Sequence, residues 1–468
     1  MPSKVLLIAA LLVGCASGDS PSRAELSPKS DATSLTTPGG TRAATAWWRA
    51  FEDPSLNQLI AQALQRNPDL SAAAARVRES RALLIAVDAD LLPRLDAQLA
   101  LASQRMSNQT GQNFPGMPRR TNVGSAAIQL TWEADLWGAV SDRAQAALAD
   151  AEAAAFRAAA VEVALAAQVT RTWFAVRLAR EELACLRADF TSRMTEMNLV
   201  TLRTQAGIDD DDMLSSARLA AAQAKADELD ATRRLGALEN ALRVLIDQPI
   251  GQPLPETVHD TDGATAPLIV KVPNFGAGIA SELLLARPDL RAASRTFDAT
   301  LAREGSAQAD FYPRFMLVGD AGWAADPASR IGKTGSGFWS LMPTVTLPIF
   351  EGQRNQSALE VARARAEIAA ADWRKSVLNA FREVDDALID LRDIAQQEEL
   401  AEKVLTAVKD RLKNAEVRAK AGLANGSEIE AARRDLYLAR RTLAGYAWER
   451  RQAAVRLAAA TGGGFTLE

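Results

Sequence analysis

The chain has few of the side chains from which catalytic and metal sites are usually built. Among its 468 residues there are two cysteines, one histidine and only 5% aromatic residues. Cys15 and Cys185 are too few for a disulfide framework, and His259 alone completes neither a zinc site nor a catalytic triad. No phosphate-binding motif is apparent. These absences argue against an enzyme and against a resident metal or cofactor.

An excess of one sign of charge is also missing. The chain has 54 Lys and Arg residues against 58 Asp and Glu residues, which gives a net charge of −4. A nucleic-acid partner would require a concentrated basic face, so none is expected. Beyond the first residues, Arg and Glu interrupt the apolar windows, and no permanent transmembrane helix is predicted.

The N-terminal residues have the pattern of an export signal. Lys4 supplies the positive charge, and residues 5–13 form an apolar stretch too short to span a bilayer. Leu12-Val13-Gly14-Cys15 resembles the lipobox of bacterial lipoproteins, in which the signal is removed before the cysteine and the thiol is acylated. The alternative is an ordinary signal with an incidental cysteine. We favour lipidation, because Cys15 lies where cleavage would fall.

The residues after Cys15 fit a lipid-anchored tether. Ala16, not aspartate, follows the cysteine; in lipoproteins of this type, the absence of that aspartate goes with sorting to the outer membrane. The stretch up to about Thr45 is rich in Ser, Thr, Pro and Gly, and it cannot bury enough apolar surface to fold alone. The covalent lipid on Cys15 is the only added group that the sequence predicts.

The rest of the chain contains one large structural unit twice. Pro68-Asp69-Leu70 recurs as Pro288-Asp289-Leu290, and in both copies a Pro-Arg pair follows at the same distance beyond the proline. Gly207 recurs in the same way as Gly422. The two copies of each motif lie almost half the chain length apart. A repeat this long duplicates a whole structural unit and is not a solenoid of small repeats.

Each copy contains a predicted β-hairpin. In the first copy, residues 95–102 and 125–132 alternate between apolar and polar side chains, the period of a strand with one apolar and one polar face. In the second copy, residues 315–323 and 339–349 repeat this pattern. Pro343 predicts a bulge or an irregular edge in the last strand.

Two long helices follow each hairpin. The first, from about Ala139 to Ala206, contains no proline or glycine, and at 1.5 Å per residue it would be roughly 100 Å long. Gly207 and Gly422 would reverse the chain into return helices. Apolar residues spaced by sevens predict packing against other helices. They are Val169, Val176, Leu183, Phe190 and Met197 in the first copy, and Val377, Val384, Leu391, Leu405 and Leu412 in the second, where Glu398 interrupts the pattern.

These patterns divide the chain into six expected parts. They are a signal peptide (1–14), the lipid-anchored tether (15–46), the first repeat (47–247, with a β-hairpin at about 94–133 and a helical hairpin at about 139–247), a linker (248–277), the second repeat (278–461, with a β-hairpin at about 314–349 and a helical hairpin at about 354–461) and a C-terminal tail (462–468).

The amphipathic strands predict an oligomer. An apolar outer face suits lipid, which tolerates β-structure only in a closed barrel. The smallest such barrels have about eight strands, so a chain with four strands must share them with other copies. The polar face of the strands predicts a water-filled bore.

Several motifs resemble one family of bacterial proteins. They are Trp47-Trp48-x-x-Phe51-x-Asp53-Pro54-x-Leu56-x-x-Leu59-Ile60, Asn67-Pro68-Asp69-Leu70, the duplicated Pro-Arg pairs and the two Ala-Gly-Ile/Leu turns. Together they resemble outer membrane efflux lipoproteins of the OprM/NodT type, in the TolC-like outer membrane factor family. The resemblance covers the whole chain beyond the tether.

The resemblance implies a mainly α fold with a small β part. Three chains would form a twelve-stranded transmembrane barrel and a long α-helical barrel, in the outer membrane of a Gram-negative bacterium and extending into the periplasm. It also implies the exit duct of a tripartite efflux pump, with a periplasmic adaptor and an inner-membrane transporter of the RND type as partners. The cargo would be drugs or other small toxic compounds, which the duct conducts passively.

By the same resemblance, the two helical turns are periplasmic tips that meet the adaptor. The expected contact residues are Gly207, Ile208, Gly422, Leu423, Arg203 and Arg418. The alternatives are that each glycine only allows a positive φ, and that each arginine is only a solvated charge.

An acidic run next to the first tip predicts an aperture. Asp209, Asp210, Asp211 and Asp212 follow the Gly207 turn directly, and Glu428 lies near the corresponding place in the second copy. Brought together by three-fold symmetry, these carboxylates would form a ring that repels itself and favours cations. Ordinary helix N-terminal charges are the alternative, with Asp212 as a candidate helix cap.

Three other functions are considered. A duct for type I protein secretion is the nearest alternative, and lipidation at Cys15 favours efflux over it. A periplasmic coiled-coil scaffold without a channel is less consistent with four strands that carry an apolar face. An envelope enzyme lacks a plausible triad. Cys185 is interpreted as a packed residue rather than a reactive thiol.

Overall fold

The computed structural model describes residues 46–107, 120–254 and 287–463. The predicted signal peptide, the tether with Cys15, His259, most of the predicted linker and residues 464–468 lie outside the described residues. Helices form most of the described chain, together with one antiparallel sheet. The predicted fold class, mainly α with a small β part and an internal duplication, is confirmed.

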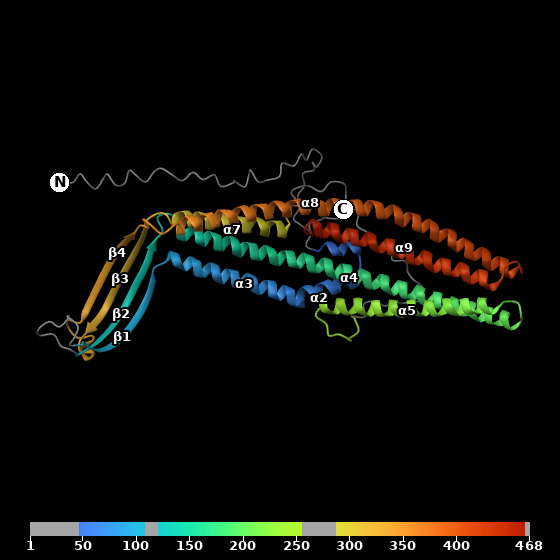
Figure 1. The fold of residues 1–468 in the computed structure, drawn as a ribbon, viewed down its shortest axis with the longest axis horizontal. Coiled ribbons are helices and arrows are strands. Elements are labelled where there is room, and N and C mark those ends of the chain that lie inside the picture. Colours follow the sequence, from blue (N-terminus) through green and yellow to red (C-terminus); the bar gives the residue numbers. More distant parts are fainter. Residues whose placement is uncertain (1–45, 108–119, 255–286, 464–468) are drawn as a thin grey trace, which may run out of the picture. The chain divides into compact units, whose positions relative to one another are not determined.

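The elements follow one another in the same order in both repeats (Figure 1). In the first repeat they are η1 (Trp47–Phe51), α2 (Pro54–Arg66), α3 (Pro68–Asp88), η2 (Ala89–Leu91), β1 (Arg94–Arg105), β2 (Arg120–Ala134), α4 (Ala139–Gln205) and α5 (Asp211–Leu245). In the second they are α7 (Pro288–Ala309), β3 (Arg314–Ala325), η3 (Ala328–Arg330), β4 (Gly337–Thr346), α8 (Arg354–Lys420) and α9 (Gly426–Ala460).

The long helices of the two repeats match position for position. α4 and α8 each have 67 residues, and α5 and α9 each have 35 residues. The start of α4 at Ala139 corresponds to the start of α8 at Arg354, and the same constant offset relates α5 to α9. Each position in α4 or α5 therefore has one equivalent in α8 or α9. The offset between β1 and β3 is slightly larger, because the second hairpin is shorter than the first.

Among the described residues, the first compact unit comprises 80–107, 120–151 and 293–375 and contains the sheet. Its strand order is β1-β2-β3-β4, with every neighbouring pair antiparallel. The central β2–β3 pairing joins the first repeat to the second. β1 and β4 are the two edges of this sheet, and their outer backbone groups face no strand among the described residues.

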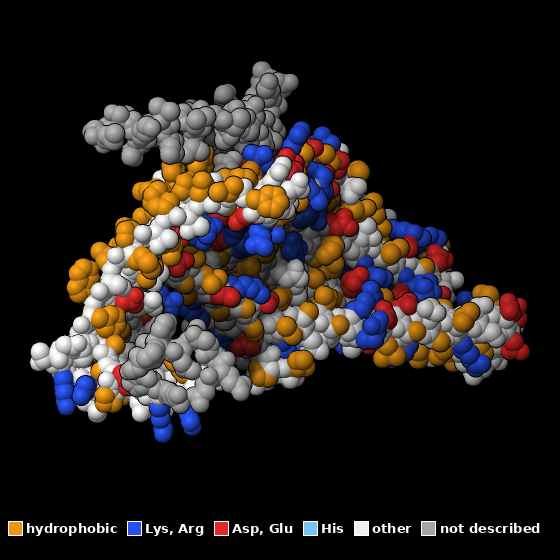
Figure 2. All heavy atoms as spheres, turned by 60° about the vertical axis from the view of Figure 1, so that its left-hand side comes forward, with side chains coloured by type: hydrophobic (Ala, Val, Ile, Leu, Met, Phe, Trp, Pro, Cys, Tyr) orange, Lys and Arg blue, Asp and Glu red, His pale blue; other side chains and the backbone are white. Residues whose placement is uncertain are grey.

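The register sorts the side chains of all four strands onto two faces. One transverse row consists of Ala97, Ile128, Ala321 and Trp339, and the next consists of Asp96, Gln129, Asp320 and Ser340. On the polar face, Gln98 donates to Gln129 at 3.1 Å. On the apolar face Leu99 and Trp339 are 76% and 78% exposed. Figure 2 shows hydrophobic side chains gathered along the outer curve of the sheet.

The last strand differs from its prediction. β4 ends at Thr346 rather than near Ile349, and Pro343 lies opposite Leu317 in an unbroken one-to-one register. The predicted bulge is therefore wrong, whereas the position at an edge is right. An edge strand tolerates proline because the missing N–H can face away from the neighbouring strand.

The second compact unit comprises residues 46–79, 152–254, 287–292 and 376–463 of the described chain. Its long helices form a layer in the order α5–α4–α9–α8, as the right half of Figure 1 shows. Ion pairs join the neighbours: Arg180–Glu239 (2.9 Å) joins α4 to α5, Glu196–Arg434 (2.6 Å) joins α4 to α9, and Glu398–Arg450 (2.9 Å) joins α8 to α9. α5 and α8 are thus the edges of the layer.

The core of the second unit explains the N-terminal motif. Phe51 packs edge-on against Phe174 of α4, with ring centroids 5.1 Å apart. Asp53 caps α2 by accepting from the Leu56 N–H at 3.1 Å, and it also accepts from the Trp173 indole at 2.8 Å. One buried carboxylate therefore starts a helix and holds that helix against α4.

α4 contains a stretch that the sequence analysis misjudged. One 18-residue window has a mean hydropathy of 1.3 with at most two charged residues, so it passes a length-and-composition test for a membrane span. The prediction that Arg and Glu interrupt the apolar windows is therefore wrong for this helix. Its Val169, Trp173 and Val176 are buried in the core of the second unit, and this packing accounts for the apolar composition.

The duplicated Pro-Asp-Leu motifs anchor the ends of the return helices. Asn67 donates from Nδ2 to the Leu245 carbonyl at 3.0 Å, and Arg287 donates from its guanidinium to the Ala460 carbonyl at 2.7 Å. Leu245 and Ala460 are equivalent positions, the last residues of α5 and α9. Each donor satisfies a carbonyl that has no partner within its own helix.

Candidate functional site

The first helical tip has the geometry of a Schellman motif at the end of α4. Gly207 has a φ of 71°. Its N–H donates to the Thr204 carbonyl at 2.9 Å, and the Ile208 N–H donates to the Arg203 carbonyl at 2.8 Å. A β-carbon at Gly207 would meet nothing within 4 Å. The positive φ, not close packing, is therefore the reason for glycine.

The second tip repeats this geometry at the end of α8. Gly422 has a φ of 74°, and the Leu423 N–H donates to the Arg418 carbonyl at 2.8 Å. Both tips present an apolar side chain to solvent, since Ile208 and Leu423 are 68% and 69% exposed. The predicted reversals at the two glycines are where the sequence placed them.

The four aspartates of the first tip have different roles. Asp209 pairs with Arg203 at 3.0 Å, and its side chain is only 9% exposed. Asp210 caps α5 by accepting from the Met213 N–H at 2.9 Å, so the interpretation of Asp212 as the cap is wrong. Asp211 and Asp212 are exposed in the first turn of α5, where the helix dipole favours carboxylates.

The second tip carries less acid. Asn425, the equivalent of Asp210, caps α9 by accepting from the Glu428 N–H at 2.9 Å. Glu428 is the equivalent of Met213, one position beyond the acidic run, and its carboxylate lies 3.6 Å from Arg418. Each return helix therefore has a side-chain cap at the same position, whereas the additional carboxylates Asp211 and Asp212 occur only in the first repeat.

Both tip arginines are engaged within their own tip. Arg203 pairs with Asp209 and Arg418 pairs with Glu428, and the Arg418 guanidinium also donates to the Leu423 carbonyl at 3.2 Å. The Arg418–Glu428 pair is exposed on both sides and contributes only about 0–1 kcal/mol, whereas the Asp209 carboxylate is nearly buried beside Arg203.

Other reactive groups do not add a site. Among the described residues, no group of three or more His, Cys, Asp and Glu side chains is placed to hold a metal ion. Cys185 is free and only 5% exposed. Burial raises the pKa of its thiol to about 11, which agrees with a packed residue rather than a nucleophile.

Comparison with known proteins identifies the family. A family model described as outer membrane efflux protein matches residues 59–247 and 279–463, one stretch in each repeat. The chain belongs to this family. Its members are efflux channels and are not known as enzymes. The efflux protein is therefore an outer membrane exit duct of a Gram-negative cell, as the sequence predicted.

Individual relatives agree over nearly the whole chain. The solvent efflux pump outer membrane protein SrpC of Pseudomonas putida is 29% identical over 417 residues, 89% of this chain and 87% of the relative. The probable outer membrane lipoprotein SilC of Salmonella typhimurium is 27% identical over 422 residues, 90% and 88% of the two chains. The open state of the Neisseria gonorrhoeae outer membrane channel MtrE is 28% identical, with a TM-score of 0.79 over 92% of this chain and 94% of that one.

Sequence reasoning missed three residues that position the tips and the return helices. Asn425 caps α9, and Asn67 and Arg287 hold the ends of α5 and α9. Asn425 could have been found, because it lies just before Glu428 at the start of a helical pattern, with the spacing of a capping box. The partners of Asn67 and Arg287 lie 178 and 173 residues away along the chain, and no local signal reveals them.

Proposed function

We propose that three copies of this efflux protein form one channel, the outer membrane exit duct of a tripartite efflux pump. The observation that carries the proposal is the sheet. Its four strands have one apolar and one polar face, and its two edge strands, β1 and β4, are unpaired on their outer sides among the described residues. Lipid does not tolerate unpaired strand edges. Pairing β4 of one copy with β1 of the next removes both edges and makes a twelve-stranded barrel from three chains.

The pairing between copies would repeat one that already exists within the chain. β2 of the first repeat pairs with β3 of the second across the middle of the sheet. A β4–β1 pairing joins the second repeat of one copy to the first repeat of the next in the same antiparallel sense. The internal duplication therefore supports a ring of alternating repeats.

The partners follow from what the channel lacks. The sequence contains no nucleotide-binding motif that could supply energy, so an inner-membrane transporter of the RND type would drive the flux. A periplasmic adaptor would contact the two tips, where exposed Ile208 and Leu423 offer apolar anchors next to Arg203 and Arg418. The cargo would be drugs, solvents or other small toxic compounds; SrpC is itself named for solvent efflux.

The acidic aperture is proposed in a narrower form. Asp211 and Asp212 are the carboxylates exposed in the first turn of α5, whereas Asp209 and Asp210 are held by Arg203 and by the α5 backbone. In a trimer, Asp211 and Asp212 would contribute six charges to the tunnel mouth. A ring of carboxylates selects cations.

The aperture can be tested by conductance. Replacing Asp211 and Asp212 by Asn should lower the preference for cations, measured as a shift in reversal potential across a KCl gradient. The matched control is Asp209→Asn, which removes a paired carboxylate and should shift it less. An unchanged reversal potential in the double variant would exclude these residues from the aperture.

Lipidation of Cys15 remains a proposal from the sequence. Mass spectrometry of the mature N-terminus should find Cys15 as the first residue, carrying acyl chains. An unmodified N-terminus at any other residue would contradict it.

The channel itself is tested on the purified full-length protein. We expect a trimer that resists SDS without heating, migrates as a monomer after boiling, and opens discrete conductance steps in planar bilayers. A protein that stays monomeric in detergent and gives no conductance would contradict the proposal.

A further inference from the structure

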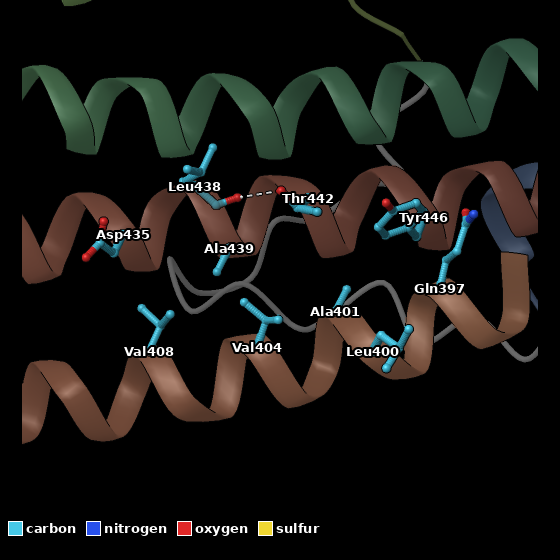
Figure 3. A pocket seen from close by; sticks show the side chains of 10 residues that line it. All are labelled: Gln397, Leu400, Ala401, Val404, Val408, Asp435, Leu438, Ala439, Thr442 and Tyr446. Carbon is cyan, nitrogen blue, oxygen red and sulfur yellow. Dashed lines mark hydrogen bonds between the residues drawn. The ribbon is translucent and has the colours of Figure 1, made fainter.

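The helical layer and the sheet each carry an apolar hollow. Figure 3 shows the hollow between α8 and α9, with Ala401, Val404 and Val408 pointing into it; it lies on the edge helix that the proposed trimer would cover. The hollow of the sheet has a volume of about 740 Å³ and lies on the apolar face. In a transmembrane barrel this face meets lipid, so a lipid is the molecule available to fill the hollow.

Small residues line the bottom of the sheet hollow, and large apolar residues surround them. Ala97, Ala126 and Ala321 are the small residues. The surrounding side chains are all more than half exposed; they are Leu99, Ile128, Trp323 and Trp339. Apolar atoms that line an empty hollow lose their dispersion contacts. A hydrocarbon chain in the hollow would restore them.

Two arginines face each other on the same face, near the turn end of the first hairpin. Arg105 and Arg120 are partners across β1 and β2, and both are exposed. Alternation along β1 places Arg105 on the face of Leu101 and Ser103, and Ser103 donates to the Asn122 side chain at 2.7 Å. Like charges directly opposite each other destabilise a strand pair. An anion between the two guanidinium groups would remove this repulsion.

No carboxylate of the described chain forms an ion pair with these two arginines. Asp326, an acid of the β3–β4 connection, accepts instead from the Asn122 N–H at 3.2 Å. At the opposite end of β1 the charge is balanced, since Arg94 pairs with Asp96 at 2.8 Å. The anion that suits the two arginines must therefore come from outside the described chain.

The β3–β4 connection adds positive charge on this face. A β-carbon at Gly124 would lie 2.5 Å from Ile331 Cδ1 and 3.1 Å from Leu101 Cδ2, so the connection packs on the apolar face of the sheet. The connection carries Arg330 and Lys333, and both are exposed. Figure 2 shows basic side chains gathered at the lower end of the sheet.

The spacing of these features matches the depth of a membrane. Arg105 lies ten residues beyond Leu95 on β1. This is about 34 Å along the strand, and roughly 26 Å along the membrane normal at a strand tilt of about 40°. The apolar band of an outer-membrane barrel is about 25 Å tall, and arginine on its lipid face is tolerated only near the boundaries. The two arginines therefore fit the level of the headgroups, and the hollow fits the hydrocarbon.

We propose that the hollow and the two arginines form one binding site for a lipid whose headgroup carries phosphate. The phosphate would lie at Arg105 and Arg120, and an acyl chain would lie in the hollow. Guanidinium groups bind phosphate through paired, charge-assisted hydrogen bonds. The lipid belongs to the outer leaflet, because the helices adjoin the other ends of the strands and the protein extends into the periplasm. This inference rests on the proposed channel, since it requires the sheet to lie in the membrane.

The site is tested by lipid binding to the full-length protein in detergent micelles. The probe is diphosphoryl lipid A, an acylated outer-leaflet lipid with two phosphates, and native mass spectrometry counts the bound molecules. Arg105→Gln combined with Arg120→Gln should weaken binding by about tenfold or more, because charge-assisted hydrogen bonds to the phosphate are lost. Equal binding by this variant and the native protein would overturn the proposal.

The matched control removes two arginines from the opposite end of the same strands. Arg94→Gln combined with Arg314→Gln changes the net charge equally, but it should alter binding by less than about twofold, because charges more than a Debye length away are screened. Ala97→Phe fills the hollow at an exposed position and should weaken binding although Arg105 and Arg120 remain. Unchanged binding by Ala97→Phe would exclude the hollow from the site.

Two further probes identify what the site recognises. Lipid A without its phosphates should bind the native protein much more weakly than the diphosphoryl form, and equal binding of the two forms would overturn the proposal. Inorganic phosphate alone should compete poorly, because it lacks the acyl chains. Its complete displacement of the lipid would show an anion site without a role for the hollow.

This inference and the proposed channel fail in different ways. If the Arg105/Arg120 variant is a conducting trimer that binds lipid A like the native protein, the lipid site is wrong and the channel proposal survives. If the native protein neither forms a trimer nor conducts, the channel proposal fails. Lipid binding is still decided in that case, because the hollow and both arginines belong to one chain.

Discussion

The two repeats share a backbone but differ in the side chains that meet other helices. Their long helices have the same lengths, their tips have the same Schellman geometry, and their return helices are anchored at equivalent carbonyls. The first repeat contacts the second through a shared hydrophobic core and through ion pairs, whereas α8 at the edge of the second repeat exposes Leu400 and Val404. In the proposed trimer, the duplicated backbone would make one helical contact inside the chain and another between chains.

The largest expected difference is in the rate of thiol alkylation between Cys185 of α4 and a cysteine introduced at the equivalent position 400 of α8. Burial raises the pKa of Cys185 to about 11 from 9.0. Because each pKa unit is a factor of ten in thiolate, alkylation at pH 8 should be about 100-fold slower than for an ordinary thiol. The rate should rise about tenfold per pH unit up to pH 10, since a raised pKa keeps the thiol protonated below it.

Maleimide labelling followed by mass spectrometry measures this rate. Leu400→Cys in a Cys185→Ala background is the matched control, since position 400 is the exposed equivalent. It should be labelled rapidly in detergent-dissociated monomers and slowly in the trimer. Rapid labelling of Cys185 at pH 8 in the folded protein would contradict the packing described for α4.

The second prediction compares the two anchors of the return helices. Arg287 is buried and joins the Ala460 carbonyl, Asp289 and Glu383. Arg287→Ala should lower the free energy of unfolding by about 2–3 kcal/mol, because it removes several hydrogen bonds of a buried charged group. The carboxylate partners are partly exposed, which keeps the cost from being larger. Asn67→Ala, which removes a neutral hydrogen bond, should cost about 1 kcal/mol. Thermal unfolding followed by circular dichroism would show the order, and a larger loss for Asn67→Ala would contradict it.

The Arg287 anchor should also depend on pH. Burial acts to raise the pKa of Asp289, but the hydrogen bond and charge of Arg287 outweigh it and lower that pKa below its ordinary value of 3.8. The contribution of the Arg287–Asp289 pair is therefore present above pH 3.8 and is lost as the pH falls through the lower folded value. The stability difference between the native protein and Arg287→Ala should shrink in acid below about pH 4.

The third prediction gives position 404 of α8 the residue found at the equivalent position 189 of α4. Val404→Asp places on α8 the residue that α4 carries at Asp189, at an exposed position on the edge helix that the proposed trimer would cover. We expect a cost of about 1–2 kcal/mol per contact between copies, because an unpaired carboxylate is buried. The SDS-resistant trimer should dissociate at a lower temperature.

Asp189→Val is the matched reverse change. Asp189 lies 3.9 Å from Arg193, and both side chains are partly exposed, so its loss should cost about 0.5 kcal/mol. Equal effects of the two substitutions on the temperature of trimer dissociation would contradict the proposed difference between the α8 edge, which contacts another copy, and α4, which packs inside the chain.

The smallest differences are expected at the tips. Gly207→Ala and Gly422→Ala should each cost about 1–2 kcal/mol locally, because alanine disfavours the left-handed conformation and no packing is affected. Hydrogen exchange at the Ile208 and Leu423 amides measures this opening directly. We expect similar increases in the exchange rate of these two amides. An unchanged exchange rate at either tip would contradict the Schellman motif described for that tip.

The sequence was sufficient where local chemistry determines structure. Gly207 and Gly422 revealed the reversals because few other residues adopt a positive φ at a helix end. The heptad positions Val169 and Val176 revealed a buried helix face, and both residues are fully buried. Alternation of apolar and polar residues predicted the two faces of the sheet.

It was insufficient where a choice depended on exact geometry or on distant partners. Asp210 rather than Asp212 caps α5, because the turn after Gly207 places Asp210 at the last non-helical position before the helix. Arg203 and Arg418 fold back onto acids of their own tips, and spacing alone could not distinguish that from free solvated charges. Pro343 forms no bulge, since an edge strand accepts it without one.

The number of chains in the particle tests the central claim most directly. Native mass spectrometry of the full-length protein, released from detergent, should give a single species with three chains, because three copies pair every open edge of the sheet and of the helical layer. A particle with one or two chains would leave those edges open and would contradict the account.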